Sequence, residues 1–418
     1  MLRGPTSPDK TDAGGIRALL DAGSLAPILA LSFLASISTG AVNNGVFFIA
    51  KEQYGFDRVP SAVLGLLVGG VYVPAALLIG PALRALIRRS QRVTARRVLV
   101  ALMVVMAGLC TLPSVVRHEA GIWLFIVLYI PLMGALWPIA EAYLSGGRRG
   151  DGLRKATGAF NLVWASAVAV AAWGMAPLLG IGRPLLILIG LGVIHLICIG
   201  PILLLPPDPR RHVDETHEPH PISYVGLLRV FRWLLVLSYV LLAALNPIMP
   251  WRLDLIGVDI AWQTPVVSAW MVSRVAMFWL VGQWGGWHGR WRTPLWSGAL
   301  LVGGFLGVLL STSIAGAIAS LVVFGAGAGV IYAAGLYYAM EVGSAEVEAG
   351  GKHEAVIGSG YTIGPMLVLL ALFVTGQDAA DSDAFPRLLS LLTLGATGIF
   401  VVLAIRSARR AMRAANDR

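Results

Sequence analysis

Twelve runs of about 20 mostly apolar residues, the length that crosses a bilayer as a helix, follow one another along this chain. They cover residues 25–50, 60–83, 97–115, 120–144, 156–180, 183–206, 227–249, 262–285, 293–311, 313–340, 354–375 and 385–406. Only 13% of the residues are charged, whereas a soluble domain carries about 25%. Because so few charges cannot cover a water-facing surface, the sequence predicts an all-α membrane protein with twelve transmembrane helices.

The Lys and Arg residues outside the runs are distributed unevenly between the two sides of the membrane. With the N-terminus inside, the cytoplasmic segments hold 25 of the 32 Lys and Arg residues, and the opposite loops hold six. Basic residues resist export in short loops. This asymmetry predicts a multi-pass protein of the cell inner (plasma) membrane with both termini in the cytoplasm. The net charge of +10 then follows from topology and does not indicate a nucleic-acid partner.

Residues 207–226 form the only sizeable polar interruption, and they divide the runs into two sets of six. The predicted parts are a cytoplasmic segment at 1–24, six-helix bundles at 25–206 and 227–406, a cytoplasmic linker at 207–226 and a cytoplasmic tail at 407–418. The linker histidines lack the spacing of a metal site, and the two cysteines lie singly inside apolar runs. We therefore expect no metal and no cofactor.

The two sets of six runs carry traces of an internal repeat at an offset of 202 residues. The residues that coincide in this register are Gly80 with Gly282, Arg88 with Arg290, Asn44 with Asn246, and Tyr72 with Arg274. Two duplicated six-helix bundles predict a pseudo-symmetric molecule, with a substrate site at the interface of the halves near mid-membrane.

The layout resembles the major facilitator superfamily over about residues 25–406. In that family, the loop between spans two and three has a Gly, an acidic residue four positions later, and then Gly-Arg. Gly80 and Arg88 fit this pattern, while Arg84 replaces the acid and Ile87 replaces the second Gly. The sequence therefore departs from the family at the acidic residue of its charge-pair latch.

A second copy of this loop and an element in run eleven extend the resemblance. The second copy keeps Gly282, Gly289 and Arg290, with Gly286 at the acidic position, and run eleven has a Gly-x-x-x-Gly-Pro element at Gly360, Gly364 and Pro365. The resemblance implies a cavity lined by spans 1, 2, 4, 5, 7, 8, 10 and 11. It also implies gating or coupling roles for these loop and run-eleven residues.

Arg274 lies near the middle of the eighth run, in VVSAWMVSRVAMFWL. An arginine at the centre of a membrane helix costs about 2.5 to 3.5 kcal/mol on insertion scales, so it is expected to face a partner or a wet cavity. One interpretation makes it the principal binding cation for an anionic or carbonyl-bearing substrate. The other is a structural ion pair.

Polar side chains elsewhere in the runs, with the asparagines in the outer halves of runs one and seven, are further candidates for substrate binding. They are Asn43, Asn44, Asn246, Tyr72 and Tyr361, and Tyr332, Tyr337 and Tyr338 of run ten are candidates for the cavity wall. Amides both donate and accept hydrogen bonds, which suits polar ligands but also suits contacts between helices. Gly40 and Gly45 flank the first pair, so close helix packing is the rival explanation.

Acidic and polar residues near the predicted cytoplasmic ends of the runs are candidates for gating or coupling. They are Glu141, Asn161, Glu341, His353 and Glu354. None of the acids lies at mid-depth in a run, so a proton, if it is the coupling ion, would be carried near the inner boundary. Capping of a helix N-terminus is the alternative explanation for Glu354.

These features predict a secondary transporter that moves a small solute by alternating access, with the lipid bilayer as its solvent. No phosphate-binding loop is present, so this chain would not itself hydrolyse ATP. The substrate is not determined, although Arg274 favours an anionic or polar metabolite. The alternatives are a transporter-like sensor or scaffold without flux, and a membrane-embedded enzyme. An enzyme is not expected, because convergent catalytic groups are missing from the sequence.

Overall fold

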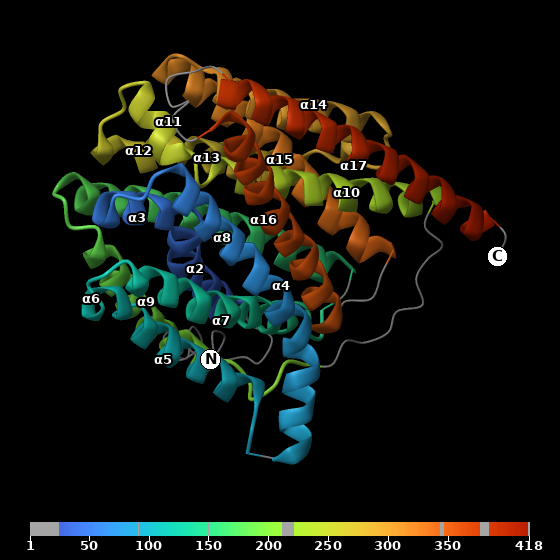
Figure 1. The fold of residues 1–418 in the computed structure, drawn as a ribbon. Helices are drawn as coiled ribbons and strands as arrows, with labels where there is room; N and C mark the ends of the chain where they lie inside the picture. Colours follow the sequence, from blue (N-terminus) through green and yellow to red (C-terminus); the bar gives the residue numbers. More distant parts are fainter. Residues whose placement is uncertain are drawn as a thin grey trace, which may run out of the picture.

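The computed structural model describes residues 25–90, 92–148, 150–210, 221–342, 347–376 and 384–416, and it is helical throughout (Figure 1). The helices of the first half are α2 (Ala26–Gly40), η1 (Ala41–Gly45), α3 (Val46–Tyr54), α4 (Arg58–Arg89), α5 (Ala95–Leu109), α6 (Leu112–Val115), α7 (Ala120–Ser145), α8 (Gly150–Gly180) and α9 (Leu185–Leu203). Those of the second half are α10 (Ile222–Leu245), α11 (Met249–Leu255), α12 (Ile260–Val267), α13 (Ala269–Gln283), η2 (Gly285–Trp287), α14 (Arg292–Leu310), α15 (Ile314–Val342), α16 (Val347–Thr375) and α17 (Ala384–Asn416).

Twelve segments among the described residues are long and apolar enough to cross a membrane, which confirms the predicted number. Their ends agree with the predicted runs to within a few residues in most cases, including the tight connections near 180–184 and 311–314. The last helix continues to Asn416, well beyond the predicted end at 406. The helices bundle because a helix satisfies its own backbone hydrogen bonds, which lipid cannot do.

Large apolar side chains point outward as well as inward. Leu78, Phe373 and Leu391 are 63%, 88% and 66% exposed, although each lies within a membrane-length helix. A protein in water rarely exposes such a surface. These side chains are therefore expected to contact lipid.

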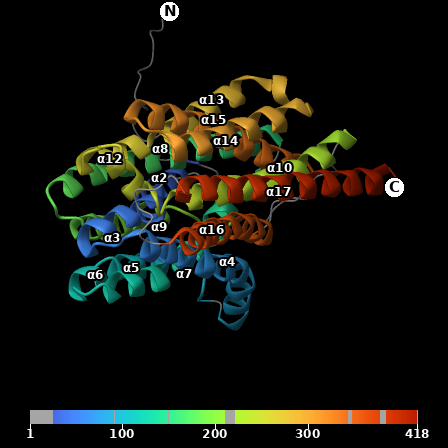
Figure 2. The ribbon, with the colours of Figure 1, turned by 45° about the horizontal axis from the view of Figure 1, so that its top comes forward.

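Helices α4 and α16 lie side by side in the middle of the molecule, as Figures 1 and 2 both show. Small residues allow the two backbones to approach closely: a Cβ atom at Gly69 would lie 2.4 Å from the carbonyl carbon of Tyr361. Because α4 belongs to the first six spans and α16 to the last six, this contact joins the two bundles.

Two membrane spans are interrupted at comparable depth. Span one contains the π-helical turn η1, which carries Asn43 and Asn44 between α2 and α3. Span eight breaks at Ser268, between α12 and α13, before it reaches Arg274. Such interruptions often occur at functional sites, because they re-aim side chains and backbone groups.

One end of the bundle exposes several arginines of α4 and the loop after it. We call this end, where α4 and α7 finish and α16 begins, the basic side, because Arg88, Arg89 and Arg92 are exposed there. The opposite end, where α3 finishes and α4 begins, is the far side.

Candidate functional site

A cavity of about 90 Å³ lies between the two bundles. Its walls come from α2, η1, α4, α7 and α8 of the first bundle and from α10, α13, α15 and α16 of the second. These helices form spans 1, 2, 4, 5, 7, 8, 10 and 11, which is the set of cavity-lining spans that the family resemblance implied. The cavity therefore touches both halves and is positioned to respond to their relative movement.

Arg274 forms the cationic part of the cavity wall, and it is only 3% exposed. Five aromatic rings lie around its guanidinium carbon: Tyr332 at 4.6 Å, Trp164 at 4.8 Å, Phe278 at 5.4 Å, Trp270 at 5.8 Å and Tyr239 at 5.9 Å, measured to the ring centroids. The negative faces of such rings stabilise a buried cation without neutralising it. Arg274 is thus held in place while its full charge remains.

Helical spacing explains part of this arrangement. Trp270 and Phe278 lie four residues before and four residues after Arg274, so all three share one face of α13. The other three rings come from neighbouring helices, Tyr239 from α10, Tyr332 from α15 and Trp164 from α8. Sequence spacing could have revealed the first two rings, but nothing in the sequence pointed to Tyr239.

The predicted alternative for Arg274, a structural ion pair, is not found among the described side chains. Its Nη2 donates a hydrogen bond to the Tyr239 hydroxyl at 3.4 Å, and no described carboxylate lies within 4.0 Å. Its Nε is buried without a hydrogen-bond partner, as are Oδ1 of Asn43 and Oγ of Ser36, and all three residues line the cavity. Buried polar atoms of this kind are normally paired, so the described side chains leave these three without the partner that such atoms usually have.

An acidic cluster forms another part of the wall. Glu141 of α7 and Glu354 of α16 have their carboxyl groups within hydrogen-bonding reach of each other. The hydroxyl of Tyr72 on α4 donates a further hydrogen bond to Oε2 of Glu354. Because α4 and α7 belong to the first bundle and α16 to the second, this cluster also connects the halves.

The structure contradicts the capping explanation for Glu354 but not its predicted position at the start of the apolar segment. Helix α16 starts at Val347, so Glu354 lies about two turns inside it and cannot cap its N-terminus. Its side chain is 6% exposed and meets Tyr72, which lies near the middle of α4. The apolar, membrane-length part of α16 nevertheless begins at Glu354, as the sequence predicted.

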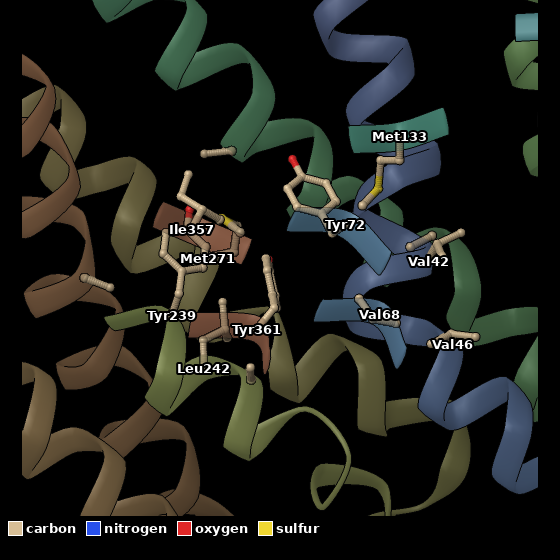
Figure 3. Packing of buried hydrophobic residues seen from close by; sticks show 14 of the residues in the cluster. Val42, Val46, Val68, Tyr72, Met133, Tyr239, Leu242, Met271, Ile357 and Tyr361 are labelled. Carbon is tan, nitrogen blue, oxygen red and sulfur yellow. The ribbon is translucent and has the colours of Figure 1, made fainter. Parts of the chain in front are cut away.

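A row of tyrosines connects the acidic cluster with Arg274. Figure 3 shows Tyr361 between Tyr72 and Tyr239. The ring centroids of Tyr72 and Tyr361 are 6.4 Å apart, and those of Tyr361 and Tyr239 are 5.4 Å apart. Since Tyr239 in turn accepts the hydrogen bond from Arg274, neighbouring side chains connect the acidic cluster with Arg274 without a gap.

On the far side of the cavity, the predicted asparagines meet across the bundle interface. Nδ2 of Asn246 donates to the main-chain oxygen of Asn43 at 3.2 Å and to Oδ1 of Asn44 at 3.4 Å. Asn44 and Asn246 are the pair that the internal repeat placed at equivalent positions. Asn43 and Asn44 line the cavity, while Asn246 holds them in place from behind.

The remaining predicted residues lie elsewhere. Arg88 and Arg290 are exposed, and Asn161 accepts a hydrogen bond from the Trp164 indole at 3.1 Å. Gly360, Gly364 and Pro365 serve close packing: a Cβ atom at Gly364 would lie 2.3 Å from the main-chain oxygen of Val240, and Pro365 packs on Gly65. Tyr337 and Tyr338 pack against Tyr224 and Trp287, away from the cavity. The side chains of Glu341 and His353 lie outside the described part of the structure.

Comparison with known proteins identifies the architecture. The family model of the Major Facilitator Superfamily matches residues 28–368. This chain belongs to the major facilitator superfamily. The match confirms the resemblance found in the sequence, and the fold of two six-helix bundles is that of the family. No curated protein sequence matches the chain significantly.

Three solved structures with this fold are distant from the chain in sequence. A POT family transporter in complex with 5-aminolevulinic acid has a TM-score of 0.64 and 12% identity, with 92% of this chain and 96% of that chain covered. The nucleoside transporter NupG has a TM-score of 0.58 and 14% sequence identity, with 93% of this chain and 98% of that chain covered. A bacterial homolog of the human lysosomal transporter Spinster, in its inward-facing and occupied conformation, has a TM-score of 0.61 and 15% sequence identity. The match covers 96% of this chain and 98% of that chain. Family and fold thus make this protein a multi-pass secondary membrane transporter of a small-molecule substrate.

Proposed function

We propose that this transporter carries a small solute with an anionic group, such as a carboxylate or a phosphate, and that Arg274 is its anchor. The observation that carries the proposal is the buried guanidinium, which lines the cavity with an unpartnered Nε and with no described carboxylate within 4.0 Å. The cost of burying this charge is best offset by an anion that binds transiently.

The other polar atoms of the cavity fit a solute with additional hydrogen-bonding groups. Oδ1 of Asn43 can accept a hydrogen bond, and the hydroxyl of Ser36 can donate or accept one. Aromatic side chains cover much of the remaining wall, including Trp137 and Phe160. Such a surface favours a compact solute with one charged end and an apolar or flat body. The 5-aminolevulinic acid bound by one protein of the same fold is a solute with a carboxylate.

The direction of the molecule in the membrane is part of the proposal. The excess of Lys and Arg at the basic side supports a cytoplasmic location for that side and for both termini, in the plasma membrane. We retain the bundle limits 25–206 and 227–406, with residues 207–226 as the linker. We assign no catalytic role, because the described lining of the cavity holds one cation and an acid pair without a nucleophile activated by a base.

The test is a thermal-shift screen of the purified protein. The panel contains lactate, succinate, glutamate, benzoate, phosphate and glycerol phosphate, each paired with an uncharged amide or alcohol analogue. We expect stabilisation by at least one anion and not by its uncharged analogue. Arg274→Ala should remove the shift of that anion and lower its affinity about 100-fold or more, because a buried hydrogen-bonded charge pair contributes about 2–5 kcal/mol.

Two variants control this result. Arg183→Ala removes an exposed arginine of the α8–α9 connection and should leave the affinity unchanged. Arg274→Lys keeps the charge but loses the flat, forked donor, so partial affinity is expected. An Arg274→Ala protein that still unfolds cooperatively and binds the anion with unchanged affinity contradicts the assignment.

A further inference from the structure

The acid pair of the cavity connects helices from different bundles. Glu141 stands four residues before the end of α7, and Glu354 stands on α16. Their carboxyl groups are within hydrogen-bonding reach, and Tyr72 donates to Glu354 from a third helix. No described lysine, arginine or histidine forms an ion pair with either acid.

The chemistry of this contact requires a proton. An ionised carboxylate can only accept hydrogen bonds, so two carboxyl groups that bond to each other must hold at least one proton between them. Two ionised acids at this distance inside the membrane would repel each other in a medium of low dielectric constant. The contact between Glu141 and Glu354 is therefore stable only as a proton-binding site.

The titratable and charged groups around the pair are few. Among the described side chains of the cavity, α4 contributes Tyr72, α10 contributes Tyr239, α13 contributes Arg274, α15 contributes Tyr332 and α16 contributes Tyr361. The lining residues of α8 are Phe160, Trp164 and Val168, which carry no charge. Arg274 is thus the one described cation that lines the cavity with the pair.

We propose that Glu141 and Glu354 form the coupling-ion site of this transporter, which takes one proton in the empty cavity and a second proton when an anion binds at Arg274. Charge balance supports this stoichiometry. With one shared proton the pair carries a charge of −1, which balances Arg274; a monovalent anion leaves an excess of −1, and one further proton restores neutrality. An unbalanced charge in this buried site would be costly. The inference of a second proton depends on the proposed function, an anion bound at Arg274, whereas the inference of the first proton does not.

The geometry also explains how proton binding is linked to movement. The shared proton bridges the two bundles, so separating them on the basic side breaks the hydrogen bond and leaves each acid alone. The tyrosine row from Tyr72 through Tyr361 to Tyr239 connects the pair with Arg274. Loading of the anion and of the proton therefore act on the same contact between the bundles.

The first experiment needs no solute. Infrared spectra of the purified full-length chain, recorded between about pH 5.5 and 9, report the C=O stretch of protonated carboxyl groups, because exposed acids remain ionised in this range. We expect a titrating band in the wild type, a midpoint displaced by about one pH unit or more in Glu141→Gln and in Glu354→Gln, and no band in the double variant. Glu119→Gln, which changes an exposed acid before α7, is the matched control and should titrate as the wild type does.

The second experiment measures proton uptake with a pH-sensitive dye in weakly buffered solution. The probe is the panel anion that gives the largest thermal shift. The wild type should take up about one proton per bound anion, and the Glu141→Gln/Glu354→Gln double variant should bind the anion with no uptake. If the double variant shows the same carboxyl C=O band as the wild type, with the same pH dependence, the proposed proton site is wrong. Failure of every panel anion overturns the proposed function alone, because the infrared result does not depend on it.

Discussion

Two buried arginines of this protein are surrounded by aromatic rings, but only one of them lines the cavity. Arg58, at the start of α4 on the far side, is 6% exposed; its guanidinium carbon lies 3.4 Å from the ring centroid of Trp251 and 5.6 Å from that of Phe385. Arg274 has a similar aromatic environment, but it faces the cavity. The same interaction thus serves a contact between the bundles in one place and the proposed binding site in the other.

The difference lies in which bundle supplies the rings. Trp251 on α11 and Phe385 on α17 belong to the second bundle, whereas Arg58 belongs to the first, so this contact must break when the far side opens. Around Arg274, only Trp164 comes from the first bundle, and the other four rings belong to the bundle of Arg274 itself. Arg274, the proposed anchor of the solute, therefore keeps most of its surroundings when the bundles rock.

Removing the contact at Arg58 should have the largest effect on opening. A reporter cysteine replaces Met175, which is 3% exposed and lines a small space between α2, η1, α8 and α13. In this background, Arg58→Ala should accelerate maleimide labelling about 10- to 30-fold, because a desolvated cation–π contact contributes up to about 2 kcal/mol. Arg274→Ala should leave the rate unchanged. Equal acceleration by both variants would contradict the division of roles.

A weaker effect is expected when Arg274 loses the one ring that crosses the interface. Trp164→Leu should lower the affinity for the best panel anion about fivefold, since one cation–π contact of about 1 kcal/mol is lost. Trp164→Phe keeps a ring and should lose less. Equilibrium binding of the anion measures both variants, and labelling at the reporter should not change in either. A changed labelling rate would show that Trp164 also holds the bundles together.

The smallest effect is expected at the ion pair of Lys51 with Asp254 on the far side. The two side chains are 26% and 45% exposed, so water and salt screen their attraction. Exposed pairs contribute about 0.2–1 kcal/mol, and Lys51→Met should therefore accelerate labelling at the reporter no more than about fivefold. High salt should accelerate the wild type in the same way and abolish the difference. An effect as large as that of Arg58→Ala would make the ion pair the main far-side contact.

The sequence was sufficient to predict the fold because bilayer length and charge asymmetry do not depend on how the helices pack. Twelve spans and two bundles are confirmed by the helices and by the family. The repeat also brought together Asn44 and Asn246, which are in contact. The spans follow from patterns within about 20 residues, whereas the charge asymmetry and the repeat emerge only when the whole chain is compared with itself.

The candidate site was only partly predictable, because its groups come from helices distant in the sequence. Arg274 was identifiable from its cost in the membrane, and Trp270 and Phe278 from helical spacing. The pairing of Glu141 with Glu354 was not, because it depends on how two bundles pack and on a helix that starts earlier than its apolar run. The contact of Tyr239 with Arg274 could not be predicted either, because it depends on how α10 packs beside α13.

The hydrogen bond of Asn246 to the π-helical turn has a consequence for how this protein can evolve. Its acceptor is the main-chain oxygen of Asn43, which every amino acid possesses, whereas its donor is a side chain. The side-chain Oδ1 of Asn43 takes no part in this bond and remains in the cavity wall. The side chain at residue 43 can thus change during evolution to suit a new solute, while the hydrogen bond from Asn246 is kept. The proposed solute contact of Asn43 and the hydrogen bond of Asn246 can therefore change independently of each other.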